Sequence, residues 1–226
     1  MILHDRLVPE EILDLSRRDA DRNFVGKQAG KHHCTQQEIH RIMLEQAAMG
    51  KTVVTLKGGD AYIFGRGGEE LEVLRSHGVD YEVVPGITAA IGCAAYAGIP
   101  LTPRDHAQSL TFVTGHRSDD QDDGLIDWPG IAGPGKTTVV YMGLGQAEKI
   151  RSSLIRAGIC RDTPVALITD GTRTMQQTHQ GTVDILPKLA RMAQKGAPGL
   201  LIIGQVAALG SNLTWFEQQP SFRSAA

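Results

Sequence analysis

A glycine-rich stretch between residues 56 and 70 holds the residue types best suited to bind a ligand. It reads LKGGDAYIFGRGGEE and places five glycines around Asp60 and Arg66. Glycines let backbone N–H groups approach a ligand closely, a carboxylate accepts from hydroxyl or ammonium groups, and an arginine grips a carboxylate. A plain turn needs only one or two glycines, so the stretch predicts a binding loop that follows a strand.

A second stretch of the same kind, VPGITA, covers residues 84–89. It also has the strand-to-helix pattern, with Thr88 as the expected helix N-cap, and capping alone would account for a threonine at this position. Two such loops on neighbouring parallel strands indicate one shared ligand site more strongly than either loop does by itself.

The elements that must position these loops alternate between strand-like and helix-like segments from end to end. This alternation predicts an α/β fold with parallel pairing and right-handed crossovers, and ligands in such folds bind at the carboxyl ends of the strands. We expect strands at 23–25, 52–56, 81–84, 109–114, 137–142, 164–169 and 200–203. We expect helices at 9–17, 35–49, 68–77, 88–97, 146–157 and 184–194.

Two details refine this organisation. Thr35 and Glu38 form a T-x-x-E capping box at the start of the helix expected over 35–49. The segment GIPLTP at 98–103 carries two prolines and interrupts the alternation. We therefore expect an N-terminal α/β domain over 1–103 and a C-terminal α/β domain over 104–226.

Composition argues against several classes of partner. The 226 residues include 23 Lys+Arg and 25 Asp+Glu, a net charge of -2, which lacks the basic excess typical of nucleic-acid binding. The longest apolar stretch, 87–100, is too short to span a bilayer, and no apolar segment typical of a secretion signal follows Met1. The three cysteines include no C-x-x-C pair. We expect a cytoplasmic protein that binds neither membrane nor nucleic acid.

Three further motifs contain residue types found in nucleotide or metal sites, but each lacks the pattern that such a site needs. Residues 130–137 match the Walker A pattern, but a strand-like segment follows where a phosphate cradle needs a helix. His32, His33, Cys34 and His40 lack the spacing of a metal site, and the acidic run within 118–136 lacks that of a calcium loop. We expect no nucleotide hydrolysis and no metal.

Several motifs together closely resemble a known family. Besides 56–70, they are VPGITAA at 84–90, GIPLT at 98–102, VTGH at 113–116, YMGL at 141–144, HDRLV at 4–8 and FVGK at 24–27. In this order, and over nearly the whole chain, they resemble the uroporphyrinogen-III C-methyltransferases, the siroheme and cobalamin branch of the tetrapyrrole methylases. A methylase of a later precorrin is disfavoured by the full GRGGEE match at 65–70.

The resemblance implies a fold and an activity. It implies a homodimer of two-domain chains, each domain a largely parallel or mixed sheet flanked by helices, with the active site in the interdomain cleft. It implies S-adenosyl-methionine as cosubstrate and no metal. The reaction would be two methyl transfers to uroporphyrinogen III, giving precorrin-2 for siroheme or cobalamin biosynthesis.

The resemblance also implies roles for individual residues. Asp5 matches the family's proposed proton acceptor, Lys27 its proposed proton donor, and Arg66 an arginine thought to act at the substrate. Because uroporphyrinogen is a polycarboxylate, its site should be locally basic, with Arg6 and Arg104 as further candidates. The positions that match cosubstrate-binding residues are Gly58, Gly59, Asp60, Ile63, Thr88, Ala89, Met142 and Gly171.

The chain also departs from the family pattern. Members normally carry a buried strand, a G-x-G-P-G-D loop and a helix before the residues that match His4, Asp5 and Arg6, and this sequence does not show them. That strand would be central and its loop would reach the cosubstrate. Ala61 also stands where the family usually has proline, and His4 where it has tyrosine.

Two hypotheses of different class follow from the departure. The chain is a working methyltransferase, either because the true start lies upstream of Met1 or because the remaining site suffices. Alternatively, it is a truncated, weakly active or inactive family member that retains partial ligand binding or dimerisation.

Overall fold

The computed structural model describes residues 1–26, 34–115 and 126–216, and its chain forms two compact units, Met1–Thr88 and Ala89–Ala226. The sequence predicted a boundary between 103 and 104, whereas the contacts divide the chain after Thr88. The reason for the difference is α4 (Ala89–Tyr96), whose buried residues Ala90, Cys93 and Ala94 pack into the core of the second unit.

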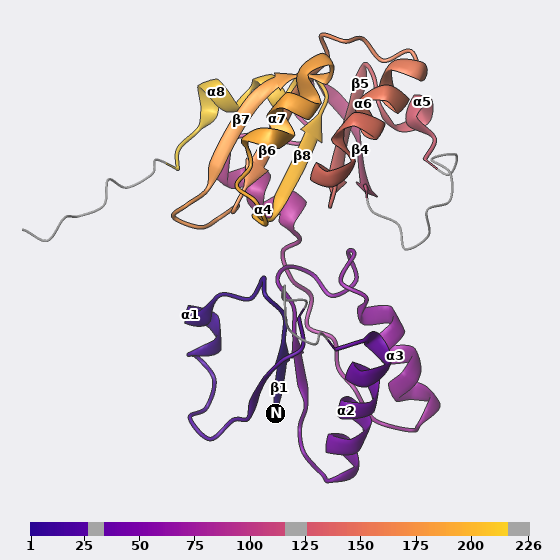
Figure 1. Cartoon of the computed structure of the whole chain (residues 1–226), viewed down its shortest axis with the longest axis vertical. Helices are drawn as coiled ribbons and strands as arrows, with labels where there is room; N and C mark the ends of the chain where they lie inside the picture. The colour runs from indigo at the N-terminus through magenta and orange to yellow at the C-terminus, as the bar shows by residue number, and fades with distance from the viewer. Residues whose placement is uncertain (27–33, 116–125, 217–226) are drawn as a thin grey trace, which may run out of the picture. The chain divides into compact units, whose positions relative to one another are not determined.

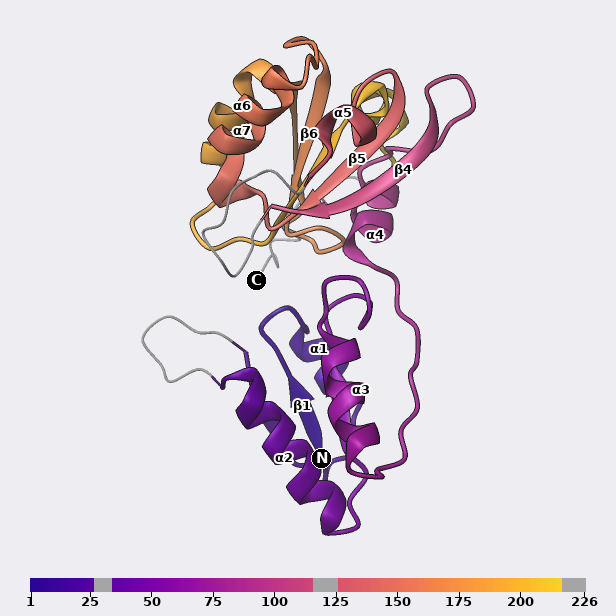
Figure 2. The same cartoon turned by 90° about the vertical axis from the view of Figure 1, so that its right-hand side faces the viewer.

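The first unit is built on a short parallel sheet. β1 (Ile2–His4) lies between β2 (Arg22–Phe24) and β3 (Val54–Leu56) and pairs in parallel with both. α1 (Glu10–Leu13) lies on one side of this sheet, and α2 (Gln36–Ala48) and α3 (Gly67–Ser76) lie on the other (Figures 1 and 2). The small core joins Leu3 of β1 to Ile39, Met43 and Leu74 of the two longer helices.

The start of α2 confirms the capping box. The Thr35 hydroxyl accepts from the Glu38 N–H at 3.2 Å, and Oε2 of Glu38 accepts from the Thr35 N–H at 2.6 Å. This reciprocal pair satisfies two amides that have no partner within the helix, which explains why the sequence located this helix within a residue at each end.

The strand predicted over 81–84 is not formed, and the prediction was wrong. Of the residues the structure describes, none makes a backbone–backbone hydrogen bond with residues 80–85, which run as an irregular stretch between α3 and α4 (Figure 2). Val84 is 80% exposed and Ile87 72%. The β-branched run favours extended backbone, but a strand also needs a neighbour, and within the described sheet β3 pairs only with β1.

The second unit contains a five-stranded mixed sheet in the order β4-β5-β8-β6-β7. β4 and β5 are parallel, β8 is antiparallel to both β5 and β6, and β6 is antiparallel to β7. The strands are β4 (Ala107–Thr114), β5 (Gly135–Tyr141), β6 (Pro164–Thr169), β7 (Gln177–Thr182) and β8 (Gly199–Ile203). The polar edge strand β7, QTHQGT, was missed because it shows no hydrophobic alternation.

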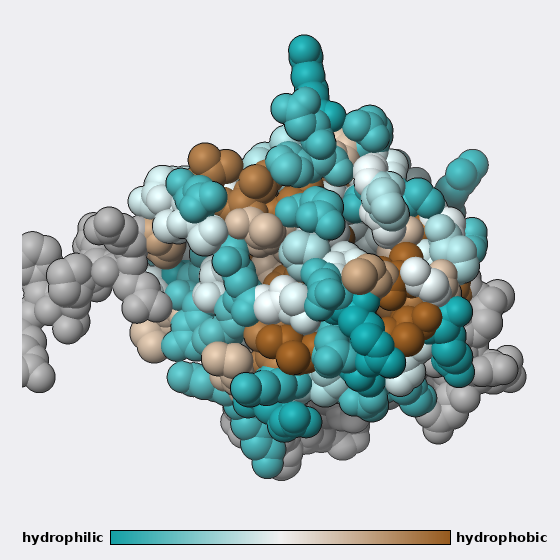
Figure 3. Space-filling view, turned by 90° about the horizontal axis from the view of Figure 1, so that it is seen from above, coloured by the Kyte–Doolittle hydropathy of each residue, from teal (hydrophilic) through white to brown (hydrophobic). Residues whose placement is uncertain are grey.

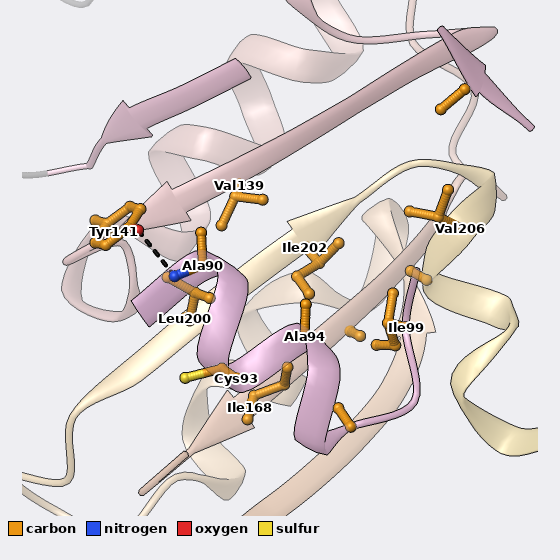
Figure 4. Packing of buried hydrophobic residues seen from close by; sticks show 14 residues of the cluster. Ala90, Cys93, Ala94, Ile99, Val139, Tyr141, Ile168, Leu200, Ile202 and Val206 are labelled. Atoms are coloured by element: carbon orange, nitrogen blue, oxygen red, sulfur yellow. Dashed lines mark hydrogen bonds between the residues drawn. The ribbon is translucent and has the colours of Figure 1, made fainter. Parts of the chain in front are cut away.

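Helices cover both faces of this sheet, so its central strands are buried on both sides. Side chains alternate along β5: Val139 and Tyr141 pack with α4, and Val140 packs with α6 (Ala147–Arg156) on the opposite face. α7 (Leu186–Met192) and α5 (Trp128–Ile131) join the face of α6. Figure 2 shows α6 and α7 across the sheet from α4, and Figure 4 shows the α4 face.

The remaining elements of the second unit are short. They are the 3-10 turns η2 (Leu144–Gln146), η3 (Val183–Ile185) and η4 (Gln205–Ala208), and α8 (Gly210–Leu213). Apolar side chains reach the surface in separate patches among polar ones in the view of Figure 3. None of the helices that the structure describes is long and apolar enough to cross a membrane.

We expect replacement of Ile202 by alanine to lower the free energy of unfolding by about 2–5 kcal/mol. Ile202 lies in β8, the central strand of the sheet, and is fully buried against α4, so its truncation leaves a cavity between well-packed elements. Urea unfolding followed by circular dichroism measures the change. The control is Met192→Ala at the half-exposed end of α7, which should change the value by less than about 0.5 kcal/mol.

Candidate active site

In the first unit, the loops that follow the three strands meet at one edge of the sheet. All three strands are parallel, so Asp5 after β1, Gly26 after β2 and Gly58 after β3 leave from the same edge. A Cβ atom on Gly26 would lie 2.9 Å from the backbone nitrogen of Arg6, and one on Gly58 would lie 2.5 Å from Cβ of Leu7. The backbones of these loops are therefore in direct contact.

The stretch at 84–88 joins the same edge through Gly86. A Cβ atom on this glycine would overlap the carbonyl oxygen of Gly59. Only glycine fits this contact, because the neighbouring atom belongs to backbone and cannot rotate away. The sequence expectation that the two glycine-containing loops lie side by side is thus confirmed, although no strand precedes the second.

The Asp60 carboxylate fastens the two loops to each other. Oδ1 accepts from the N–H groups of Tyr62 at 2.9 Å and Ile63 at 3.2 Å, and Oδ2 accepts from the Gly86 N–H at 2.9 Å. These bonds, that from Gly86 foremost, favour the charged form and lower the pKa of Asp60. From the sequence we expected this carboxylate to accept from a ligand's hydroxyl or ammonium group. In the structure it accepts from backbone N–H groups and so holds the loop in its conformation.

The same loop closes on itself before α3 begins. The Gly67 N–H donates to the Ala61 carbonyl at 2.9 Å, and a Cβ atom on Gly65 would lie 2.7 Å from the carbonyl oxygens of Asp60 and Ala61. This crowding explains the number of glycines in the stretch, since each contact brings backbone against backbone.

Arg66 stands at the exit of the loop with its guanidinium engaged by a neighbour. Its Nε donates to Oε1 of Glu69 at 2.8 Å and its Nη2 to Oε2 at 2.6 Å, and just over half of the side chain is exposed. The hydrogen-bonded pairing lowers the pKa of Glu69 and raises that of Arg66. The arginine is thus held in a bidentate geometry that a substrate carboxylate can also take.

Of the two residues matched to proton transfer, the structure describes one. Asp5 follows β1, and its Oδ1 accepts from the Leu7 N–H at 2.8 Å, which closes a tight turn. Leu7 is also the residue against which Gly58 packs, so Asp5 belongs to the same group of loops. Lys27 lies outside the described residues.

In the second unit, a corresponding edge carries Met142 and Gly171. β5 and β6 both run antiparallel to β8 and therefore parallel to each other, so Met142 after β5 and Gly171 beyond β6 lie at the same edge. A Cβ atom on Gly171 would overlap Sγ of Cys93 in α4, so this loop lies against the helix. The Cys93 thiol is buried, which raises its pKa to about 11 and keeps it protonated.

The start of α4 is tied to the same edge by Tyr141. Its hydroxyl accepts from the Ala90 N–H at 2.8 Å, as Figure 4 shows, and so satisfies an amide in the first turn of the helix. Ala89 is the first residue of α4, and Thr88 precedes it and is buried. Sequence reasoning missed Tyr141 and Cys93 as residues that shape this edge, although Tyr141 stands in the quoted YMGL motif.

Left-handed backbone marks the loops of both units. Among the described residues, the non-glycine residues with positive φ are Phe64, Arg66, Met142, Asp170 and Thr172, with φ of 55°, 59°, 53°, 48° and 67°. All five lie in the loops that follow β3, β5 and β6. Such conformations cost free energy and concentrate at functional sites, and for the β-branched Thr172 the strain is greatest.

The structure describes the other sequence motifs only in part. β5 begins at Gly135, inside the Walker A match, and Nζ of Lys136 donates to the carbonyl of Gly130 at 2.6 Å, which confirms a loop that enters a strand. His40 contacts Gln36, and His32 and His33 lie outside the described residues, as do residues 116–125 of the acidic region. The described part of the chain contains no cluster of three metal-binding side chains.

Comparison with known proteins relates this chain to a protein family and to solved structures. The sequence profile described as Tetrapyrrole (Corrin/Porphyrin) Methylases matches residues 1–187. The chain belongs to the tetrapyrrole methylase family. Among solved structures, this chain is similar to uroporphyrin-III C-methyl transferase from Thermus thermophilus complexed with S-adenyl homocysteine, with a TM-score of 0.75 and 33% identity over 92% of this chain and 86% of that chain.

Curated relatives of the chain carry one recurrent name. Siroheme synthase from Edwardsiella ictaluri is 51% identical over 96% of this chain, and siroheme synthase 2 from Serratia proteamaculans is 52% identical over 98%. The chain spans only 46% of the length of each. A solved cobalt precorrin-4 methyltransferase has a TM-score of 0.74 at 24% identity, covers 91% of this chain and 84% of that one, and supports the fold alone.

We expect Gly86→Ala to destabilise the protein by about 1–3 kcal/mol, because the added methyl group would push apart the two loops that Gly86 and Gly59 join. The control is Gly68→Ala, where a Cβ atom would meet nothing within 4 Å. Urea unfolding of both variants provides the comparison. Equal stability of G86A and G68A would show that the loops do not touch in solution.

Asp60 also gives a pH dependence with a defined sign. Its pKa is lowered from 3.8 in the folded state, so its contribution to stability is full above the unfolded value and is lost as the pH falls through the lower folded value. We therefore expect Asp60→Asn to be less stable than the parent protein at neutral pH and the two to converge below about pH 4. Urea unfolding at stepped pH measures the difference in stability between the two proteins. Arginine partners also lower the pKa values of Glu69 and Asp184, but both proteins contain these groups, so their contributions cancel in the difference. A constant difference down to pH 3 would contradict the assignment.

Proposed function

We propose that the chain is an S-adenosyl-methionine-dependent C-methyltransferase that methylates uroporphyrinogen III twice to give precorrin-2. The observation that carries the proposal is the junction of the 58–60 and 84–88 loops at Asp60, in a chain whose solved relative holds S-adenyl homocysteine. The siroheme synthase relatives support a place in siroheme biosynthesis. We also propose that the chain forms a homodimer and acts in the cytoplasm.

The residues of both units suit the cosubstrate. In the first, Gly58 is exposed and Gly59 is partly exposed, and Ile63 presents a partly exposed apolar surface. In the second, Met142 is half-exposed at the end of β5 and Gly171 keeps its loop close to α4. We propose that these residues, with Asp60, Thr88 and Ala89, hold the cosubstrate.

When bound, S-adenosyl-methionine supplies an already activated methyl group, so the chain mainly has to align it with an electron-rich pyrrole carbon. Asp5 is suited to take up the proton that the methylated ring sheds. Oδ1 of Asp5 is held by the Leu7 N–H, and within the described residues Oδ2 makes no hydrogen bond, so this oxygen can accept. Arg66 would receive a substrate carboxylate, and Lys27 is proposed to donate a proton.

The test is incubation of the full chain with S-adenosyl-methionine and uroporphyrinogen III under anaerobic conditions, with mass spectrometry of the product. We expect a mass increase of two methyl groups. Asp5→Asn should lower kcat by about 10²–10⁴-fold without weakening S-adenosyl-homocysteine binding, because it removes only the proton acceptor. Asp19→Asn, at an exposed residue paired with Arg17, is the matched control. A chain that neither binds the cosubstrate nor turns over would refute the proposal.

The alternative function, a weakly active or inactive member that keeps partial ligand binding or dimerisation, is favoured by one observation. Residues 80–85 lack backbone hydrogen bonds to the described chain and expose Val84, so the first sheet is narrower than the sequence predicted. Thermal stabilisation by S-adenosyl-homocysteine without methylated product would support this alternative. Sedimentation equilibrium determines whether the chain dimerises.

A further inference from the structure

Glu70, in α3, is the one charged side chain that is buried in the part of the chain that the structure describes. It is 3% exposed and forms an ion pair with Lys57, which is 20% exposed. Oε1 of Glu70 also accepts from Nε2 of Gln36 at 3.2 Å. Gln36 in turn lies 3.2 Å from Nε2 of His40. A buried carboxylate thus connects three elements of the first unit.

The position of this pair relates it to the loop that carries Asp60. Lys57 follows the last residue of β3 and directly precedes Gly58 and Gly59. Glu70 lies in the first turns of α3, just beyond Arg66 and Gly67. The ion pair therefore joins the entry of the 58–66 loop to its exit, and Gln36 anchors both to the start of α2.

Stability alone does not account for a buried pair at this point. Burial of two charges removes their hydration, and apolar residues of similar size often stabilise a protein as well or better. An ion pair differs from apolar packing in that it fixes one separation between the groups it joins. The apolar contacts among Leu74, Ile39 and Met43 lack this directionality.

We propose that Lys57 and Glu70 are positioning residues for the cosubstrate, which hold the two ends of the 58–66 loop at one separation before any ligand binds. The preformed loop presents Gly58, Gly59 and Asp60 in the arrangement fastened to Gly86. Because the loop is already ordered, ligand binding does not have to supply the free energy of ordering it, and the affinity is correspondingly higher. The identity of the ligand rests on the proposed function. The claim that the ion pair holds the loop in one conformation does not.

The experiment compares Lys57→Met and Glu70→Gln with Glu45→Gln, which breaks an exposed ion pair with Arg41 on α2. For both loop variants we expect the Kd of S-adenosyl-homocysteine, measured by calorimetry, to rise about tenfold or more. We expect kcat at saturating cosubstrate to fall much less, since bound ligand restores the loop. Lys57→Arg keeps the charge and should recover most of the affinity. Unchanged affinity in folded K57M and E70Q would overturn the proposal.

A double variant separates positioning from stability. Lys57→Met combined with Glu70→Met replaces the pair by apolar side chains, so we expect it to regain the thermal stability that each single variant loses. We expect its affinity for S-adenosyl-homocysteine to stay weak, because the directional contact is absent. If affinity returns together with stability, the pair is structural only and the proposal fails. This variant also decides the question if the single variants do not fold.

Hydrogen exchange of the amides in residues 58–66 gives a readout that needs no ligand. Faster exchange of these amides in the double variant than in the parent protein, with exchange in α2 unchanged, supports the proposal, and equal exchange overturns it. If the parent chain bound no S-adenosyl-homocysteine, the proposed function would fail. The exchange of the loop would still show whether Lys57 and Glu70 position it.

Discussion

The arrangement of the first unit's candidate site depends on one carboxylate that accepts three backbone N–H groups. Asp60 binds Tyr62 and Ile63 within its own loop and Gly86 in a stretch 26 residues away. Gly86 is also in close contact with the backbone of Gly59. The junction therefore requires glycine at position 86 and a hydrogen-bond acceptor at position 60. The loop geometry and the lowered pKa of Asp60 both follow from this junction.

Much of the fold was predictable because its strongest signals are local. The capping box at Thr35 and Glu38 located α2, and the continuous apolar run of β8 follows from burial on both faces. The misses have tertiary causes. β1 is three residues long and has no periodicity to detect, β7 is a polar edge strand, and residues 81–84 have strand-forming side chains but no strand beside them.

The candidate site was predictable as a set of loops but not as a set of contacts. The glycines and charges of 56–70 identified the loop, whereas the partners of Asp60, Arg66 and Glu70 could not be deduced from their spacing. Arg66 was expected to face a substrate and is engaged by Glu69. Glu70, which the sequence did not single out, is buried beside Lys57. Such pairings depend on how α2, α3 and β3 pack, which is information that no single segment contains.

The left-handed residues of the loops have a consequence for engineering and for evolution. Glycine at Phe64, Arg66, Met142, Asp170 or Thr172 would relieve backbone strain in the folded state, so a search for stabilising substitutions would be drawn to these five positions. Each of them nevertheless carries a side chain at a loop end where parallel strands terminate. A stabilised version of this protein should therefore leave them unchanged, and sequence drift toward glycine at several of them would indicate relaxed selection on the loops rather than improvement of the fold.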